Sequence, residues 1–153
     1  MIGQLEMNHG AMLARLCRSA PRGRGIKLSA AGRSGYILDE KVGLYVKYST
    51  KRMSPWTFNF SNVHQAEIAE LATQLAEVFI GLVCGTDGIV CLTHEEFRRV
   101  LDDDVRPSEW VRATRRRDEQ YSVTGSDSVS IIKIADAEYP AKIYEALSRA
   151  QEA

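Results

Sequence analysis

The order of apolar and polar residues predicts strands through the middle of the chain. Trp56, Phe58 and Phe60 alternate with small polar residues, and a spacing of two places the three rings on one face of a strand. The segments 36–39 and 44–49 also have the composition of strands, and a short glycine-containing turn joins them. We therefore expect three consecutive strands before the central amphipathic helix.

Apolar residues at spacings of three and four predict helices on both sides of these strands. A helix is expected over 63–76, where Ile68, Leu71 and Leu75 share one face. The segment 78–84 is apolar on both faces, which is typical of a central buried strand. The same criteria predict helices over 4–19, after Thr93 and from Asp136 onward, and strands over 89–93, 110–115, 120–124 and 129–134.

This order of elements predicts an α/β or α+β fold, with a mixed, mainly antiparallel sheet, flanking helices and the order α-βββ-α-ββ-α-βββ-α. A chain of 153 residues is the size of a single domain and can bury a core without disulfides. Within 1–153 we expect a core over 5–93 and an added C-terminal meander and helix over 94–153.

Two finer predictions concern cysteines and a run of acids. Asp87-Gly88 is a signal for a two-residue hairpin turn, which would place Cys84 opposite Cys91, both reduced. The run 102–104 consists of three aspartates at the end of a helix. It could bind a cation weakly, but the pattern favours a solvated acidic helix end, because calcium loops interleave their ligands with a glycine turn.

Charge is balanced over the whole chain but is unevenly distributed. Twenty basic and twenty acidic residues cancel, so binding to a polyanion has to come from local patches. Residues 7–38 contain no acid, and the glycine-rich part of this segment carries Arg22, Arg24 and Lys27, which could track phosphates or serve as a solvated connector. A second cluster beside Trp110 and Tyr121 consists of Arg112, Arg115, Arg116 and Arg117, and it suits single-stranded or bent nucleic acid. The alternative is a solvated, salt-bridged hairpin, because Glu109, Asp118 and Glu119 flank these arginines.

The order helix, three strands, helix, strand resembles the core of the PD-(D/E)xK nuclease superfamily over about 5–93. Leu44-Tyr-Val-Lys47-Tyr-Ser49 resembles the catalytic strand of that family. The resemblance implies Asp39 as a metal-binding and catalytic aspartate, Lys47 as the catalytic lysine and Mg²⁺ as the cofactor of an active enzyme. The family also requires an acid two positions before the lysine, where this chain has Tyr45; Glu67 or Glu70 of the following helix would have to replace it.

Two classes of function follow from these features. The first is a nucleic-acid-associated, restriction-endonuclease-like domain that binds DNA or RNA, either as a metal-dependent phosphodiesterase or without activity. The second is a non-enzymatic interaction module that forms a homodimer through exposed aromatic strand surface. The chain contains no secretory signal pattern and no apolar run near the length of a membrane span, so we expect a cytoplasmic protein without a membrane partner.

Overall fold

The strands assemble into two sheets in the computed structural model, which describes residues 1–128 and 130–152. The five-stranded sheet has the order β1-β2-β3-β5-β6, and the four-stranded sheet has the order β4-β7-β8-β9. The strands are β1 (Leu28–Ala31), β2 (Gly35–Leu38), β3 (Val42–Ser49), β4 (Trp56–Phe60), β5 (Glu77–Cys84), β6 (Gly88–Thr93), β7 (Glu109–Thr114), β8 (Tyr121–Gly125) and β9 (Ile132–Ile134). The helices are α1 (Gln4–Arg18), α2 (Asn62–Gln74), α3 (His94–Val100) and α4 (Glu138–Glu152).

The predicted fold class is confirmed, because helices flank sheets whose strand pairs are mostly antiparallel. The one parallel pair among the described residues is β3 with β5, and α2 lies in the connection between them. The pairs of the four-stranded sheet are antiparallel.

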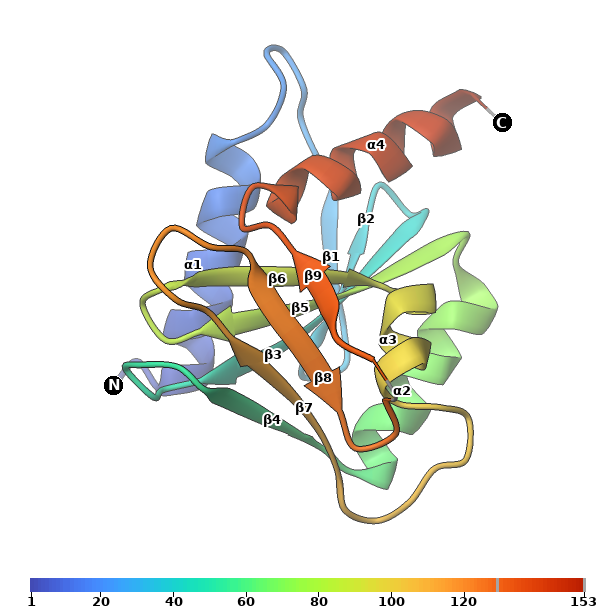
Figure 1. Cartoon of the computed structure of the whole chain (residues 1–153). Helices are drawn as coiled ribbons and strands as arrows, with labels where there is room; N and C mark the ends of the chain where they lie inside the picture. The colour runs from blue at the N-terminus through green and yellow to red at the C-terminus, as the bar shows by residue number, and fades with distance from the viewer. Residues whose placement is uncertain (129, 153) are drawn as a thin grey trace.

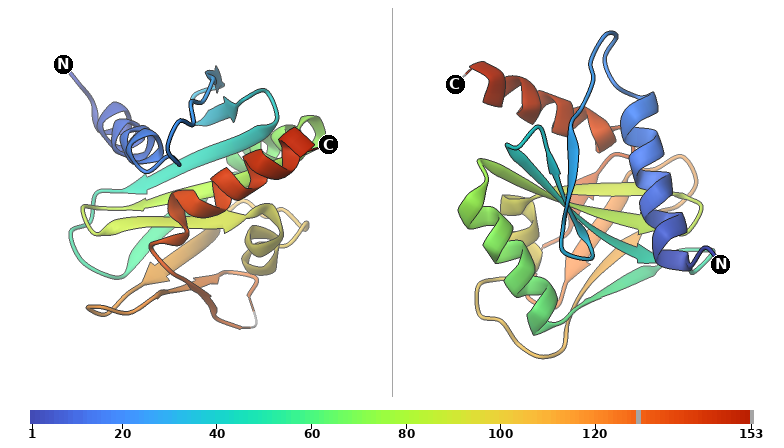
Figure 2. Two further views of the ribbon diagram at one scale, coloured as in Figure 1. Left: turned by 90° about the horizontal axis from the view of Figure 1, so that it is seen from above. Right: turned by 180° about the vertical axis from the view of Figure 1, so that it is seen from behind.

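The layers are seen most clearly from above (Figure 2, left). Helices α1 and α4 cover one face of the five-stranded sheet, and the four-stranded sheet packs against the other face beside α2 and α3 (Figure 1). Met12 of α1 and Leu147 of α4 join the apolar cluster of the first interface. Phe58 of β4 and Ile80 of β5 join the cluster between the two sheets. β5 is apolar on both faces because it lies between these two clusters.

Strand β4 corrects the predicted sheet. The sequence suggests that Trp56–Phe60 continues the sheet after β3, but the strand pairs with β7 instead. Its rings still pack in one cluster with Ile68 and Leu71 of α2, as the alternation predicts. The segments 5–93 and 94–153 therefore do not form separate sheets.

Two local predictions also differ from the structure. The sequence pattern predicts no strand before residue 36, but residues 28–31 form β1 and pair with β2. In the β5–β6 hairpin, Cys84 is opposite Gly88 and Cys91 is opposite Gly81, so three residues rather than two make the turn. This odd shift in register places the two thiols on opposite faces of the sheet. Val129, the expected start of the last strand, lies outside the described residues.

Candidate functional site

Lys47 and three neighbouring polar side chains form a cluster between β3 and α2, called here the Lys47 cluster. Alternation along β3 directs Tyr45 and Lys47 to the face that α2 covers. The Tyr45 hydroxyl donates to Glu67 Oε1 at 2.9 Å, and Lys47 Nζ lies 3.2 Å from His64 Nδ1. Lys47 Nζ is also 5.4 Å from the centre of the Phe60 ring.

The N-terminus of α2 determines which ring nitrogen of His64 is the acceptor. His64 Nδ1 accepts the backbone N–H of Ser61 at 3.2 Å, so this nitrogen carries a lone pair and can also accept from the Lys47 ammonium. Burial and the charge of Lys47 lower the pKa of His64. Burial lowers the pKa of Lys47, and the charge of Glu67 opposes that shift.

Asp39 lies far from the Lys47 cluster. It occupies the β2–β3 turn next to the register pair of Leu38 and Val42. Lys47 is five residues further along β3 than Val42, which is about 16 Å at 3.3 Å per residue. Asp39 binds the Arg24 guanidinium at 2.7 Å and the backbone N–H of Lys27 at 2.8 Å. The structure therefore corrects the expectation that Asp39 and Lys47 share one centre.

The same placement separates Asp39 from Glu67, the other expected metal ligand. Glu67 faces Gly32 in the β1–β2 turn, at the opposite end of this hairpin from Asp39. Hydrogen bonds to Asp39 from the Lys27 backbone N–H and from the Arg24 side chain outweigh its burial and lower the pKa of its carboxyl group. Its role in the structure is to hold the basic loop against the β2–β3 turn.

The residues around Lys47 do not fit the two-carboxylate Mg²⁺ centre that the resemblance implies. Mg²⁺ requires oxygen ligands and is usually held by one or two carboxylates. The charge of Glu67 acts against the burial of Lys47 on the Lys47 pKa, and the Tyr45 hydroxyl donates to Glu67 Oε1. Glu70 lines a hollow of about 220 Å³ beside Tyr45 and Glu67, but its side chain is exposed. The phenol of Tyr45 does not replace the missing acid, because its pKa is raised. Burial is the main cause, and the hydrogen bond to Glu67 and the charge of Glu67 add to it.

The first predicted basic cluster is largely neutralised by its neighbours. Arg24 is paired with Asp39, and Lys27 Nζ lies 2.5 Å from Glu40 Oε1. Arg22 is exposed in the loop that follows α1. This loop therefore offers fewer free charges than the sequence indicates.

The outer face of the four-stranded sheet carries no helix from the described part of the chain (Figures 1 and 2). Alternation in its strands directs apolar side chains inward and polar ones outward. The outward residues define what we call the open face: Thr57, Asn59, Trp110, Arg112, Thr114, Ser122, Thr124 and Lys133. No carboxylate is among these eight described residues, although the chain contains twenty acids.

The cations of the open face are bound by neutral groups. The Arg112 guanidinium lies 4.7 Å from the centre of the partly exposed Trp110 ring and donates to the Thr57 hydroxyl at 3.3 Å. Lys133 Nζ donates to the Ser122 hydroxyl at 2.5 Å. Neither cation forms an ion pair with a described acid, so both charges remain available to an anion.

The second predicted basic cluster lies at one end of the open face. Arg115, Arg116 and Lys133 line a pocket of about 420 Å³, together with the acid Glu119. Arg115 and Arg116 also line an adjoining pocket of about 330 Å³, whose other charged residues are Arg52, Arg117, Asp87 and Asp118. Arg115 pairs with Asp87 at 2.9 Å and lies 4.5 Å from the centre of the Tyr121 ring, which the sequence did not place inside the protein.

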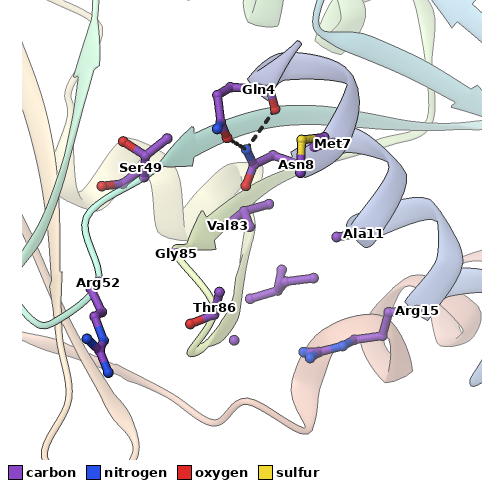
Figure 3. A pocket seen from close by; sticks show the side chains of 13 residues that line it. Gln4, Met7, Asn8, Ala11, Arg15, Ser49, Arg52, Val83, Gly85 and Thr86 are labelled. Atoms are coloured by element: carbon purple, nitrogen blue, oxygen red, sulfur yellow. Dashed lines mark hydrogen bonds between the residues drawn. The ribbon is translucent and has the colours of Figure 1, made fainter. Parts of the chain in front are cut away.

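A larger pocket of about 560 Å³ lies between α1 and the ends of β3 and β5 (Figure 3). It is at the carboxyl ends of the parallel strands, a common position for ligands in sheets with parallel pairs. Arg15 and Arg52 line its wall, and none of the described acids does. Arg52 also lines the 330 Å³ pocket, which in turn shares Arg115 and Arg116 with the 420 Å³ pocket. The three pockets are therefore linked by shared arginines.

Comparisons with protein-family models, with curated proteins and with solved structures gave no match for this chain. Among the described residues, no helix has the length and apolar composition needed to cross a membrane.

Sequence reasoning missed how the polar side chains of three strands combine. Arg112 and Trp110 were visible in one strand, but Thr57 belongs to a strand that was assigned to another sheet. The period-two pattern of each strand identifies its polar face. The pairing of β4 with β7 is needed to show that these faces adjoin.

Proposed function

We propose that the protein binds single-stranded nucleic acid on the open face and along the adjoining arginine-lined pockets, without cleaving it. The observation that carries this proposal is the composition of the open face. Its described residues combine an aromatic ring, two cations and a series of hydroxyl groups, with no carboxylate to repel phosphates. Proteins that bind single strands commonly combine stacking side chains with a positively charged groove.

Each part of this surface suits a different part of a nucleotide. A base can stack on Trp110 or on the plane of the Arg112 guanidinium. Thr114 and Lys133 line the 420 Å³ pocket, and Thr114 is about 13 Å from Trp110 along the strand direction. Phosphates that leave the stacked base in this direction would meet Lys133, Arg115 and Arg116.

A single strand fits this surface better than a duplex. The open face belongs to a four-stranded sheet, which is wider than the helix or two-stranded ribbon that enters a major groove. Unpaired bases can lie flat against such a sheet.

The Lys47 cluster supports binding without cleavage. It keeps a lysine beside one carboxylate and, among the described residues, lacks the second acid that a Mg²⁺-dependent nuclease of the PD-(D/E)xK type needs. The Lys47 ammonium also contacts His64 Nδ1 and lies against the Phe60 ring. We infer that the protein has a nuclease-like order of elements but binds nucleic acid without cleaving it.

The test is fluorescence anisotropy with labelled single-stranded DNA and RNA and with a matched duplex, at several salt concentrations. Trp110→Ala should weaken single-strand binding by about 1–3 kcal/mol, which is roughly 5-fold to 150-fold. Lys133→Ala and Arg116→Ala should each reduce the log–log slope of affinity against salt by about 0.7 for each phosphate that is no longer neutralised. Arg22→Ala is the matched control, since it removes an exposed arginine from the distant basic loop.

Several results would contradict the proposal. Absence of binding at low salt would leave the non-enzymatic interaction module as the function to pursue. An equal loss of affinity in Arg22→Ala and Arg116→Ala would move the interface to the basic loop. Cleavage that requires Mg²⁺ or Mn²⁺ and disappears in Lys47→Ala would show a nuclease centre at the Lys47 cluster.

A further inference from the structure

Three acidic residues from separate segments meet at the end of the four-stranded sheet that is opposite the arginine-lined pockets. Asp102 follows α3, Glu109 is the first residue of β7, and Asp127 lies between β8 and β9. One carboxylate oxygen of each residue lies within 4.8 Å of the corresponding oxygens of the other two. We call this group the acidic triad.

Glu109 gives the triad a buried and incompletely bonded carboxylate. Its side chain points into the protein and the residue is 2% exposed. Glu109 Oε2 accepts the amide N–H of Gln65, and Gln65 Oε1 in turn lies 3.5 Å from the Arg98 guanidinium. This orientation of the Gln65 amide supplies a donor to the carboxylate.

The second oxygen of Glu109 has no such donor. Glu109 Oε1 is buried and has no hydrogen-bond partner among the described residues. An oxygen in this position is costly unless a cation or a proton compensates it. The neighbouring acids repel an unprotonated Glu109, so a cation or a proton within the triad would stabilise this arrangement.

Backbone contacts hold the three segments in place. The backbone N–H of Asp102 donates to Asp127 Oδ2 at 3.2 Å, and the backbone N–H of Asp127 donates to the carbonyl of Val100 at 3.2 Å. A Cβ atom at Gly125 would overlap that same Val100 carbonyl, so the loop after β8 packs directly on the end of α3. The carboxylates therefore converge through the fold rather than through one flexible loop.

We propose that Asp102, Glu109 and Asp127 bind a divalent cation with a preference for oxygen ligands, and that this cation is Ca²⁺. Ca²⁺ accepts mono- or bidentate carboxylates in irregular geometry at about 2.3–2.6 Å. Two ligands on opposite sides of such an ion are about 4.6–5.2 Å apart. The oxygens of the triad lie within 4.8 Å of one another, so all three could contact one ion. Mg²⁺ requires shorter bonds and keeps several waters, which suits this set of three carboxylates less well.

A shared proton is the competing explanation. Burial, with a further contribution from Asp127, raises the pKa of Glu109, and a protonated Glu109 would donate to Asp127 without any metal. Arg106 also lies near the triad, but it is exposed and bonds Asp104 at 3.3 Å. A titration with metal distinguishes these explanations, since only the cation site responds to it.

The experiment uses the full chain after treatment with a chelator. Calorimetric titration with CaCl₂ and with MgCl₂ should show saturable heat for Ca²⁺ and weaker binding of Mg²⁺. The melting temperature should rise by about 5–10 °C at a hundredfold excess of Ca²⁺ over its dissociation constant. Glu109→Gln and Asp127→Asn should each abolish both signals. Asp103→Asn, which neutralises an exposed neighbour outside the triad, should keep them.

The outcomes decide the proposal independently of nucleic-acid binding. Absence of heat and of a melting shift at millimolar Ca²⁺ would overturn it. So would a Ca²⁺ response that persists in Glu109→Gln. A Glu109→Gln variant that is more stable than the parent, in a protein that does not respond to Ca²⁺, would identify the shared proton instead.

Discussion

Replacing Phe58 by alanine tests whether the two sheets form one core. Phe58 is central in β4, is 1% exposed and belongs to the cluster that joins both sheets to α2 and α3. Truncating a buried phenylalanine typically costs about 3–5 kcal/mol through lost burial and the remaining cavity. The total stability of a domain is about 5–15 kcal/mol, so we expect Phe58→Ala to remove a large fraction of it.

Urea denaturation followed by circular dichroism and by tryptophan fluorescence measures this loss. The midpoint should fall by the corresponding amount, and the melting temperature should fall by about 6–20 °C. Asn59→Ala is the matched control, because the adjacent Asn59 side chain lies on the open face. Its effect should stay within about 0.5 kcal/mol.

The two spectroscopic signals should change together. Trp56 and Trp110 lie in the four-stranded sheet, whereas most of the helix signal comes from helices on the five-stranded sheet and between the sheets. Coincident transitions would support a single cooperative unit. A loss below about 1 kcal/mol in Phe58→Ala, or separate transitions for the two signals, would refute the reasoning.

Two further predictions concern buried titratable groups. His9 is buried, and its Nε2 has no hydrogen-bond partner among the described residues. Burial lowers the pKa of His9, so the unfolded chain binds the proton more readily than the folded protein. The contribution of His9 to stability should therefore be complete above about pH 6.5 and decrease as the pH falls. His9→Gln should flatten the change in unfolding free energy between about pH 7.5 and 5.5, and an unchanged slope would contradict this. Cys17 is exposed, while Cys84 and Cys91 are buried and burial raises the pKa of Cys91 to about 12. A thiol reagent should therefore find one fast thiol in the native protein and three after denaturation, and two fast thiols would be inconsistent with the fold.

Most of the elements could be predicted from the sequence, whereas the sheet to which β4 belongs could not. The alternation of Trp56, Phe58 and Phe60 fixes a strand with one buried face, and that face is where the pattern places it. Alternation does not determine the partner of a strand. Here the partner is β7, roughly fifty residues later, and nothing local distinguishes it from β3.

The separation of Asp39 from Lys47 could not be predicted from the sequence for a related reason. Asp39 and Lys47 lie on the same β2–β3 hairpin, but the distance between them depends on where the chain turns. Asp39 itself occupies that turn, whereas Lys47 lies well along β3. A resemblance in the order of elements does not fix this register. The sequence presents Glu109 as an acid beside a basic strand, which hides the acidic triad. Its alternation with Val111 and Ala113 is the signal that it points inward.

The pairing of β4 with β7 also has a consequence for synthesis of the chain. A ribosome adds about 5–20 residues per second, so roughly fifty residues separate the appearance of β4 from that of its partner by about 3–10 seconds. During this interval β1, β2, β3, β5 and β6 can already assemble, since all their pairings lie within the first 93 residues. The aromatic face of β4 can contact this nascent sheet and α2, but its edge has no strand to bond. The five-stranded sheet is thus able to form first and to act as the template on which the second sheet closes.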